Sequence, residues 1–440
     1  MNTRDLPTDR PLDETLLPRE QLAPWLDAVE AAFPGLGAAE FVDVALRRTL
    51  TRTLRYLPDG TVFVITGDIP AMWLRDSSAQ MWPYLRLIAD DPHGPLADMI
   101  LGVLKRQFAY IAHDPYGNAF NSEPNGNSYH QGDLDPDPLL WERKYEVDSL
   151  CLPVLLAARF ARLTGRAGEL TDALAGAVPG IVETIRTEQD HAASAYRFIR
   201  PDTVAQDTLT HDGRGAPVAR TGMTWSAFRP SDDACTYGYN VPGNLLAAKA
   251  LDELAELVEA LGLPLERAAE ARGVADEIRA GVRAAGLVDV PGLGSIYAYE
   301  TDGLGNHLLM DDANLPSLIG LPLLSDVRVD DELYQRTRAW VLSPANPYYY
   351  SGSAAAGIGS PHTAPGHVWP IALAVEGLTS TDERRRHELV ALLLATRGGT
   401  EYMHEGFHVD DPTWFSRDWF SWADAMACEL ILDCVAPAAR

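Results

Sequence analysis

The segment Glu383–Leu394, ERRRHELVALLL, places charged side chains on one side of a helix and leucines on the other. This pattern is typical of a helix that covers a core and turns its polar face to solvent. Apolar residues recur at three- and four-residue spacings along most of the chain, so helices dominate the prediction. The predicted helices span 19–33, 38–54, 77–90, 95–112, 146–163, 168–188, 232–260, 264–284, 326–340, 367–377, 382–396 and 417–435.

Strand signals are few. The run LPDGTVFVITGD (57–68) predicts a hairpin around a turn-forming Asp-Gly pair, and 295–299 predicts one more short strand. Long loops rich in Gly, Pro, Asn, Asp and aromatic residues separate the helices, and loops of this length are uncommon unless they carry function. These loops span 113–141, 201–231, 286–310 and 343–366. The pattern favours an all-α toroid of paired helices, in one domain over 1–440 with 1–18 as a loosely ordered extension.

Charge and cysteine usage narrow the class of protein. The 440 residues include 36 Lys and Arg against 62 Asp and Glu, a net charge of −26. Such a balance argues against nucleic acid and anionic membranes as partners, and most of the carboxylates are expected to lie on a solvated surface. The N-terminal residues lack a signal-peptide h-region, so no secretory signal is expected. No run of about 18 apolar residues occurs, so no transmembrane helix is expected. None of the four cysteines lies in a CxxC pair, so no zinc site is expected from them. A cytoplasmic protein with reduced thiols is expected.

The segment 66–80, TGDIPAMWLRDSSAQ, is the first with the chemistry of a sugar site. Its indole offers a flat face to a pyranose ring, and its charged groups offer forked hydrogen bonds to neighbouring hydroxyls. The candidate binding residues are Asp68, Trp73, Arg75 and Asp76. The alternative is structural: Asp76 or Ser77 caps the following helix, with Gln80 as its capping-box partner, and the indole is packed.

Two further polar segments follow, NAFNSEPNGN (118–127) and WERKYEVD (141–148). The asparagines alone could simply form tight turns. The charges of the second segment form either a surface salt-bridge lattice or a buried polar network around a polyol. The candidate ligands of hydroxyl groups are Asn118, Asn121, Glu142, Arg143 and Asp148.

The segment 222–234, GMTWSAFRPSDDA, contains two adjacent acids, Asp232 and Asp233. One of them could cap the helix predicted from 232, but two adjacent residues cannot both be caps. A general acid must stay protonated near neutral pH, which requires desolvation or a nearby carboxylate. Trp225 and Arg229 are candidate binding residues of the same segment, and the choice between the two acids stays open.

The segment 404–408, HEGFH, contains Glu405 on an aromatic-rich loop, where neither packing nor capping explains a glutamate. His404 and His408 have the spacing of zinc ligands. A glycine lies between them, however, whereas a zincin motif needs a continuous helix, so no metal site is predicted. His404 is kept as a binding residue, as is Trp422, in the predicted first turn of the final helix.

Smaller markers complete the candidate site: Asp312, which could equally cap a helix, and the loop residues Tyr349 and His362. No Walker lysine and no GxSxG elbow occurs. Polar, aromatic loops on a helical toroid suit a carbohydrate, and glycoside hydrolysis needs two carboxyl groups on opposite sides of the scissile bond.

The strings TGDIPAMWLRDSSAQ, WERKYEVDSLC, GMTWSAFRPSDDACTYGY and HEGF…WFSWAD closely resemble the family-125 glycoside hydrolases, exo-α-1,6-mannosidases, over roughly residues 20 to 435. Gly406 departs from the family, whose members often carry Ser there. The resemblance implies an (α/α)6 barrel and an inverting mechanism without metal or cofactor. It also implies that Asp232 or Asp233 is the general acid and Glu405 the general base.

The implied partner is an α-mannoside oligosaccharide, and a monomer or weak homodimer is expected. Two rival functions remain on the same fold. A non-catalytic carbohydrate-binding protein would release no mannose, and a glycoside phosphorylase would require phosphate, for which no clear Arg/Lys cluster is evident near Glu405.

Overall fold

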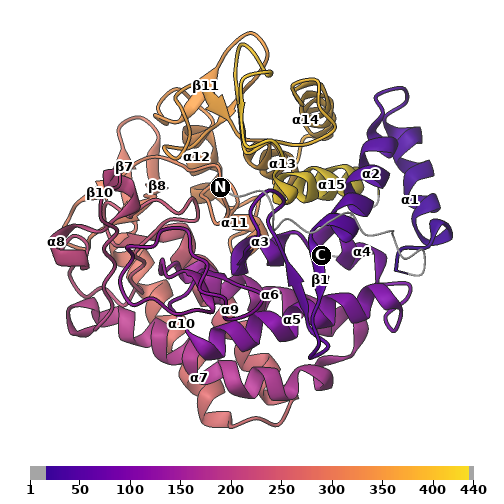
Figure 1. The fold of residues 1–440 in the computed structure, drawn as a ribbon. Coiled ribbons are helices and arrows are strands. Elements are labelled where there is room, and N and C mark those ends of the chain that lie inside the picture. Colours follow the sequence, from indigo (N-terminus) through magenta and orange to yellow (C-terminus); the bar gives the residue numbers. More distant parts are fainter. Residues whose placement is uncertain (1–15, 436–440) are drawn as a thin grey trace.

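The computed structural model describes residues 16–435, and helices make up most of them (Figure 1). The longer helices are α1 (Arg19–Ala32), α2 (Ala38–Arg52), α5 (Pro95–His113), α6 (Val147–Thr164), α7 (Thr171–Thr187), α9 (Val241–Ala260), α10 (Leu265–Ala285), α12 (Glu332–Val341), α13 (Pro370–Leu378), α14 (Glu383–Ala395) and α15 (Ser421–Val435). Shorter helical segments are α3 (Leu74–Ala79), α4 (Trp82–Leu87), η2 (Ala167–Leu170), η3 (Glu188–Ala193), η4 (Ala205–Asp207), α8 (Thr210–Gly213) and α11 (Leu321–Leu324).

An inner set of helices forms a ring in the order α3/α4, α6, α9, α11, α13 and α15. Gly320, just before α11, approaches Val375 of α13, and α15 returns to α3 and α4. Outer helices cover the ring: α5 packs on α6, α10 on α9, α14 on α13 and α15, and α2 on α15. Figure 1 shows the result, with the indigo helices α1 and α2 beside the yellow α14 and α15. The first and last helices therefore close the ring.

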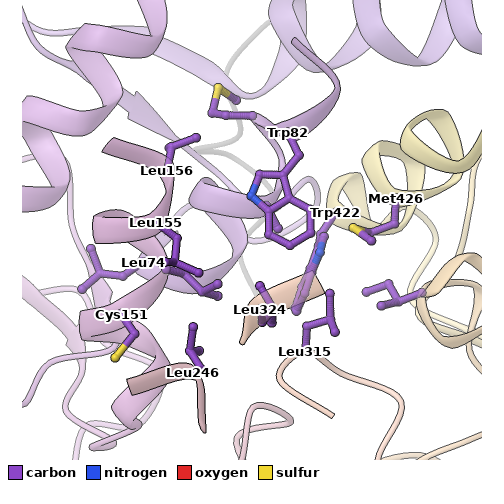
Figure 2. Close-up of a cluster of buried hydrophobic side chains, with 14 of the residues drawn as sticks. Leu74, Trp82, Cys151, Leu155, Leu156, Leu246, Leu315, Leu324, Trp422 and Met426 are labelled. Carbon is purple, nitrogen blue, oxygen red and sulfur yellow. The ribbon is translucent and has the colours of Figure 1, made fainter. Parts of the chain in front are cut away.

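The inner and outer helices differ in sequence pattern for a physical reason. Every residue of α13 is buried, and so are nearly all residues of α6 and α15. A helix that is apolar all round belongs inside a core, whereas α14 buries only its leucine and valine face, as its sequence predicts. Side chains from five of the inner helices meet in the centre of the ring, among them Leu74, Trp82, Leu155 and Trp422 (Figure 2).

Short strands lie in the loops between helices. They are β1 (Leu54–Tyr56), β2 (Val62–Val64), β3 (Met72–Trp73), β4 (Ala119–Phe120), β5 (Leu140–Glu142), β6 (Tyr239–Asn240), β7 (Leu287–Val290), β8 (Gly294–Tyr297), β9 (Glu300–Thr301), β10 (His307–Leu308), β11 (Tyr349–Ser351), β12 (Ala356–Ile358), β13 (His367–Val368), β14 (Gly406–His408) and β15 (Phe415–Ser416). All their pairings are antiparallel. The predicted hairpin is present as β1–β2, where Gly60 adopts a φ of 80° in the turn, and the strand predicted at 295–299 is β8.

Four predicted helix starts are wrong. The helix predicted from 326 begins at Glu332, as α12. The helix predicted over 77–90 begins earlier, at Leu74, and is divided into α3 and α4. The helix predicted from 232 begins at Val241, because Asn240 is the residue whose side chain accepts the hydrogen bond of the cap, from the Gly243 amide. The final helix begins at Ser421, and Arg417 precedes it with a φ of 55°. The later starts at 241 and 421 place the polar residues before them in loops.

Residues 1–15, most of the extension predicted over 1–18, lie outside the described residues, and Leu16 and Leu17 are buried in the core. No helix between residues 16 and 435 has the length and apolarity needed to cross a membrane.

Candidate active site

Arg75 organises the first half of the site from the first turn of α3. Its side chain is buried, and its guanidinium lies against carboxyl groups from two other segments. Nη1 donates to Glu146 Oε2 at 2.5 Å and to Asp148 Oδ2 at 3.0 Å, and Nη2 donates to Asp232 Oδ1 at 2.9 Å. Arg75 Nε lies 3.8 Å from Asp76 Oδ2. One guanidinium therefore holds together α3, the start of α6 and the Asp232 loop.

Asp232 lies in a tight turn. The sequence had allowed it to be a helix cap, but no helix begins at this position. The turn is closed by a bridge between Phe228 and Ala234, and Asp232 adopts a φ of 65°, which aspartate tolerates better than most residues. Lys144 Nζ donates to the backbone carbonyl of Asp232 at 2.7 Å and to Asp207 Oδ1 at 3.0 Å. The strained loop is thus fixed through both its backbone and its side chain.

The ionisation of this cluster follows from burial and crowding. Burial would raise the pKa of Asp232, but Arg75 and the hydrogen bond from Glu146 hold it below its ordinary value. Burial raises the pKa of Glu146 well above its ordinary value, Arg75 opposes this, and the charge of Asp232 adds to it. Burial also raises the pKa of Asp76 to about 6, against the opposing charge of Arg75. Ionised and protonated carboxyl groups therefore coexist around one cation.

Asp233 points away from Arg75 and pairs with a different loop. His362 Nδ1 lies 2.9 Å from Asp233 Oδ1, and the Asp233 side chain is almost fully buried. Burial lowers the pKa of His362, but the hydrogen bond to Asp233 and the charge of Glu405 together raise it to about 9. The imidazole is therefore a cation at neutral pH, within electrostatic reach of Asp232, Asp233 and Glu405.

Glu405 precedes β14 and forms the second half of the site. Its Oε1 lies 3.8 Å from Arg417 Nη1, and Arg417 in turn is held by Asp68 and by the Thr66 hydroxyl. The strand pairings β13–β14 and β14–β15 fix the backbone on both sides of Glu405. Arg417 also contributes charge at Asp76, which links the two halves of the site.

The sequence profile of the family described as metal-independent alpha-mannosidase (GH125) matches residues 37–432. The chain belongs to this family. It is therefore a glycoside hydrolase, an α-mannosidase. A Schizosaccharomyces pombe protein described as meiotically up-regulated gene 157 protein is 38% identical over 418 residues, which cover 90% of this chain and 82% of that protein.

Solved structures agree with this assignment. A metal-independent alpha mannosidase from Streptococcus pneumoniae, in a non-productive complex with alpha-1,6-mannobiose, is 45% identical. The match covers 95% of this chain and 98% of that chain, with a TM-score of 0.91. The glucoamylase from Saccharomycopsis fibuligera is 13% identical over 95% of this chain and 96% of that chain, with a TM-score of 0.57, and shares the fold alone. The predicted (α/α)6 fold is confirmed.

The α-mannosidase brings about half of its sequence-predicted site residues together. Those around the two charge clusters are Asp68, Arg75, Asp76, Asp148, Asp232, Asp233, His362 and Glu405. Asp312 lies just behind them, accepting a hydrogen bond from Ser231 Oγ at 2.7 Å. Asn118 and Glu142 are hydrogen-bonded to each other beside Lys144, at 2.9 Å.

The other candidates are engaged elsewhere, mostly in packing. Trp225 stacks on His191 at 3.5 Å between ring centroids, and Trp73 packs with Trp141. His404 stacks on Phe415 at 3.6 Å. Asn121 is bound to loop carbonyls, Arg143 to Asp114 and Arg229 to Glu300. Trp422 lies in the central core, but its ring centroid is also 5.9 Å from the guanidinium carbon of Arg75, so it borders the first half of the site. These aromatic residues remain predicted sugar contacts, although an indole that could stack on a sugar is equally suited to a core.

Tyr349 illustrates the effect of strand alternation. It lies beside Glu376 and Arg385, toward the outer helix α14, whereas its neighbour Tyr348 lies close enough to Arg229 and Asp312 to sense their charges. Successive side chains of an extended segment point to opposite sides, so Tyr348 lies nearer the carboxyl groups of the site, and Tyr349 stays a prediction.

Four residues of the site were not predicted: Lys144, Glu146, Arg417 and Tyr348. The first two follow a signal that sequence reasoning could have used. In WERKYEVD the residues at 142, 144 and 146 alternate with Arg143, Tyr145 and Val147 from the end of strand β5 to the start of α6, so they share one side of an extended segment. Among the described residues no group of three or more His, Cys, Asp or Glu side chains is arranged to hold a metal ion.

Proposed function

We propose that this α-mannosidase hydrolyses terminal α-1,6-linked mannose with inversion, with Asp232 as the general acid and Glu405 as the general base. The substrate class follows from the Streptococcus pneumoniae relative, which is complexed with alpha-1,6-mannobiose and is 45% identical. Inversion requires the two carboxyl groups to stand roughly 6.5–9.5 Å apart, so that water fits between the base and the sugar.

The observation that carries the assignment is the difference between the two adjacent aspartates. The Asp232 side chain is 25% exposed, whereas that of Asp233 is 2% exposed and bound to His362. A general acid must reach the leaving oxygen, and only Asp232 combines access with neighbouring carboxyl groups that hold a proton. Asp233 serves better as the anchor of the His362 loop.

Glu405 fits the role of base because two cations lie near it and its carboxyl oxygens stay available to a water molecule. The cations of Arg417 and His362 lie near it, and neither makes a close hydrogen bond that would occupy its lone pairs. In the proposed reaction, water attacks the anomeric carbon while Glu405 takes its proton, and Asp232 protonates the departing oxygen.

Free mannose released from α-1,6-mannobiose tests the proposal directly. Glu405→Gln should abolish turnover while leaving mannobiose binding largely intact, because the amide keeps the shape of the side chain but cannot accept the proton. Glu401→Gln, an exposed position four residues earlier, is the matched control and should behave as the unmodified enzyme. Near-normal kcat in Glu405→Gln would exclude Glu405 as the base.

The phosphorylase alternative makes a separate prediction. Arg417 does lie near Glu405, where the sequence had suggested no clear cationic cluster, but Asp68 and Thr66 occupy its guanidinium. Water is then the favoured acceptor, and mannose release should not depend on added phosphate. A requirement for phosphate would favour phosphorolysis instead.

A further inference from the structure

Four carboxyl groups surround the single guanidinium of Arg75. If all four were ionised, one positive charge would face four negative charges. The carboxyls belong to Asp76, Glu146, Asp148 and Asp232, and the first three are at most 6% exposed. Three further cations act on the cluster from its edges: Lys144 and His362 on Asp232, and Arg417 on Asp76. Each is engaged by carboxylates of its own, Lys144 by Asp207 and Glu142, His362 by Asp233 and Arg417 by Asp68.

Like charges this close and this buried cannot all be ionised, so protons remain in the cluster at neutral pH. Glu146 is the member best placed to hold one. Its side chain is fully buried, and its Oε1 has no hydrogen-bond partner among the described residues. Its Oε2 accepts from Arg75 and from Ser149 Oγ, and the same guanidinium also binds the carboxyl of Asp232.

This arrangement addresses a difficulty in the proposed mechanism. Arg75 and Lys144 favour the ionised form of Asp232, whereas a general acid must deliver a proton. A second carboxyl that keeps the shared proton allows Asp232 to be polarised by Arg75 and still act as an acid, as in other carboxyl pairs that share one proton.

We propose that Glu146 holds the proton that Asp232 delivers to the leaving oxygen. The inference rests on the proposed function. The proton held by Glu146 moves onto Asp232, and Asp232 delivers it to the departing oxygen as the glycosidic bond breaks, which leaves both carboxyl groups ionised. The attacking water loses its proton to Glu405, and solvent returns one proton to the pair after the products leave. Glu146 thus acts through Asp232 as a positioning residue and does not touch the sugar.

Dependence on the leaving group separates this role from a structural one. An alkoxide leaving group needs a proton, whereas dinitrophenolate departs without one. Glu146→Gln should therefore lower kcat on α-1,6-mannobiose by roughly 100-fold or more but change kcat on 2,4-dinitrophenyl α-mannoside little. Asp232→Asn should show the same contrast. Asp148→Asn, which removes another Arg75 partner, should affect both substrates alike.

Two results would overturn the inference: folded Glu146→Gln losing activity equally on both substrates, or keeping normal turnover of mannobiose. If the variant does not fold, the infrared spectrum of the unmodified enzyme still tests the inference. Its infrared spectrum at neutral pH should contain a protonated-carboxyl band that shifts in Asp232→Asn, and the lack of such a band would also overturn the inference. Failure of the unmodified enzyme to release mannose would instead reject the proposed function.

Discussion

The contact between Asp233 and His362 predicts how stability depends on pH. In the folded protein the pKa of His362 is about 9, against an ordinary value of 6.5. At about 1.4 kcal/mol for each tenfold change in proton affinity, this rise corresponds to roughly 3 kcal/mol favouring the imidazolium. The side chain is 34% exposed and also senses Glu405 and Asp232, so solvent and these neighbours reduce the share of Asp233 to about 1–2 kcal/mol.

The sign follows from the direction of the change. Because the folded pKa lies above the unfolded one, the contribution is complete below pH 6.5 and is lost as the pH rises through 9. The free energy of unfolding should therefore fall over this range. Asp233→Asn should remove about half of the fall and bring the His362 pKa closer to its ordinary value.

Urea unfolding at several pH values, with NMR titration of the His362 ring, measures both quantities. Glu401→Gln, an exposed acid on another loop, should leave both unchanged. The reasoning is refuted if His362 titrates at its ordinary pKa in the unmodified protein, or if Asp233→Asn leaves a pKa of about 9 in place.

Three further predictions concern a tyrosine at the site, a leucine in the core and the independence of activity from metal ions. Tyr348→Phe should raise KM for mannobiose more than Tyr349→Phe, because only Tyr348 lies near the Asp312 side of the site; equal effects in steady-state kinetics would contradict this. Leu155→Ala, in the central cluster of Figure 2, should lower the free energy of unfolding by about 2–5 kcal/mol, whereas Leu163→Ala, 41% exposed on the same helix, should cost far less. Dialysis against EDTA should leave mannose release unchanged, as the family description implies, and loss of activity restored by a divalent cation would contradict it.

Helices could be predicted well from the sequence because apolar periodicity is a local property. Eight of the long helices, α14 among them, lie close to their predicted ranges. The errors at 232 and 417 have a common cause: charged residues before an apolar run look like a helix start, yet here tertiary ion pairs hold them in loops. Asp232 is bound by Arg75, and Arg417 by Asp68, over 150 or more positions. A pattern read over a short stretch of sequence cannot identify partners that lie so far along the chain.

The site was predictable in its carboxylates and less so in its aromatics. Asp232 and Glu405 were selected because acidic residues on aromatic loops need partners, and the structure supplies them. Trp225 and Trp422 were selected on composition alone, and both are buried by packing. Glu146 belongs to the segment predicted to form a surface lattice or a buried polar network, but it was not among the candidate ligands, because a sugar site is predicted from residues that could touch the ligand and not from those behind them.

The anomer released first from α-1,6-mannobiose tests the central claim most directly. Proton NMR recorded during the first minutes of hydrolysis should show β-mannose appearing before mutarotation, because a single displacement by water activated at Glu405 inverts the anomeric carbon. Initial release of α-mannose would contradict the account and require a covalent intermediate in place of the Asp232–Glu405 pair.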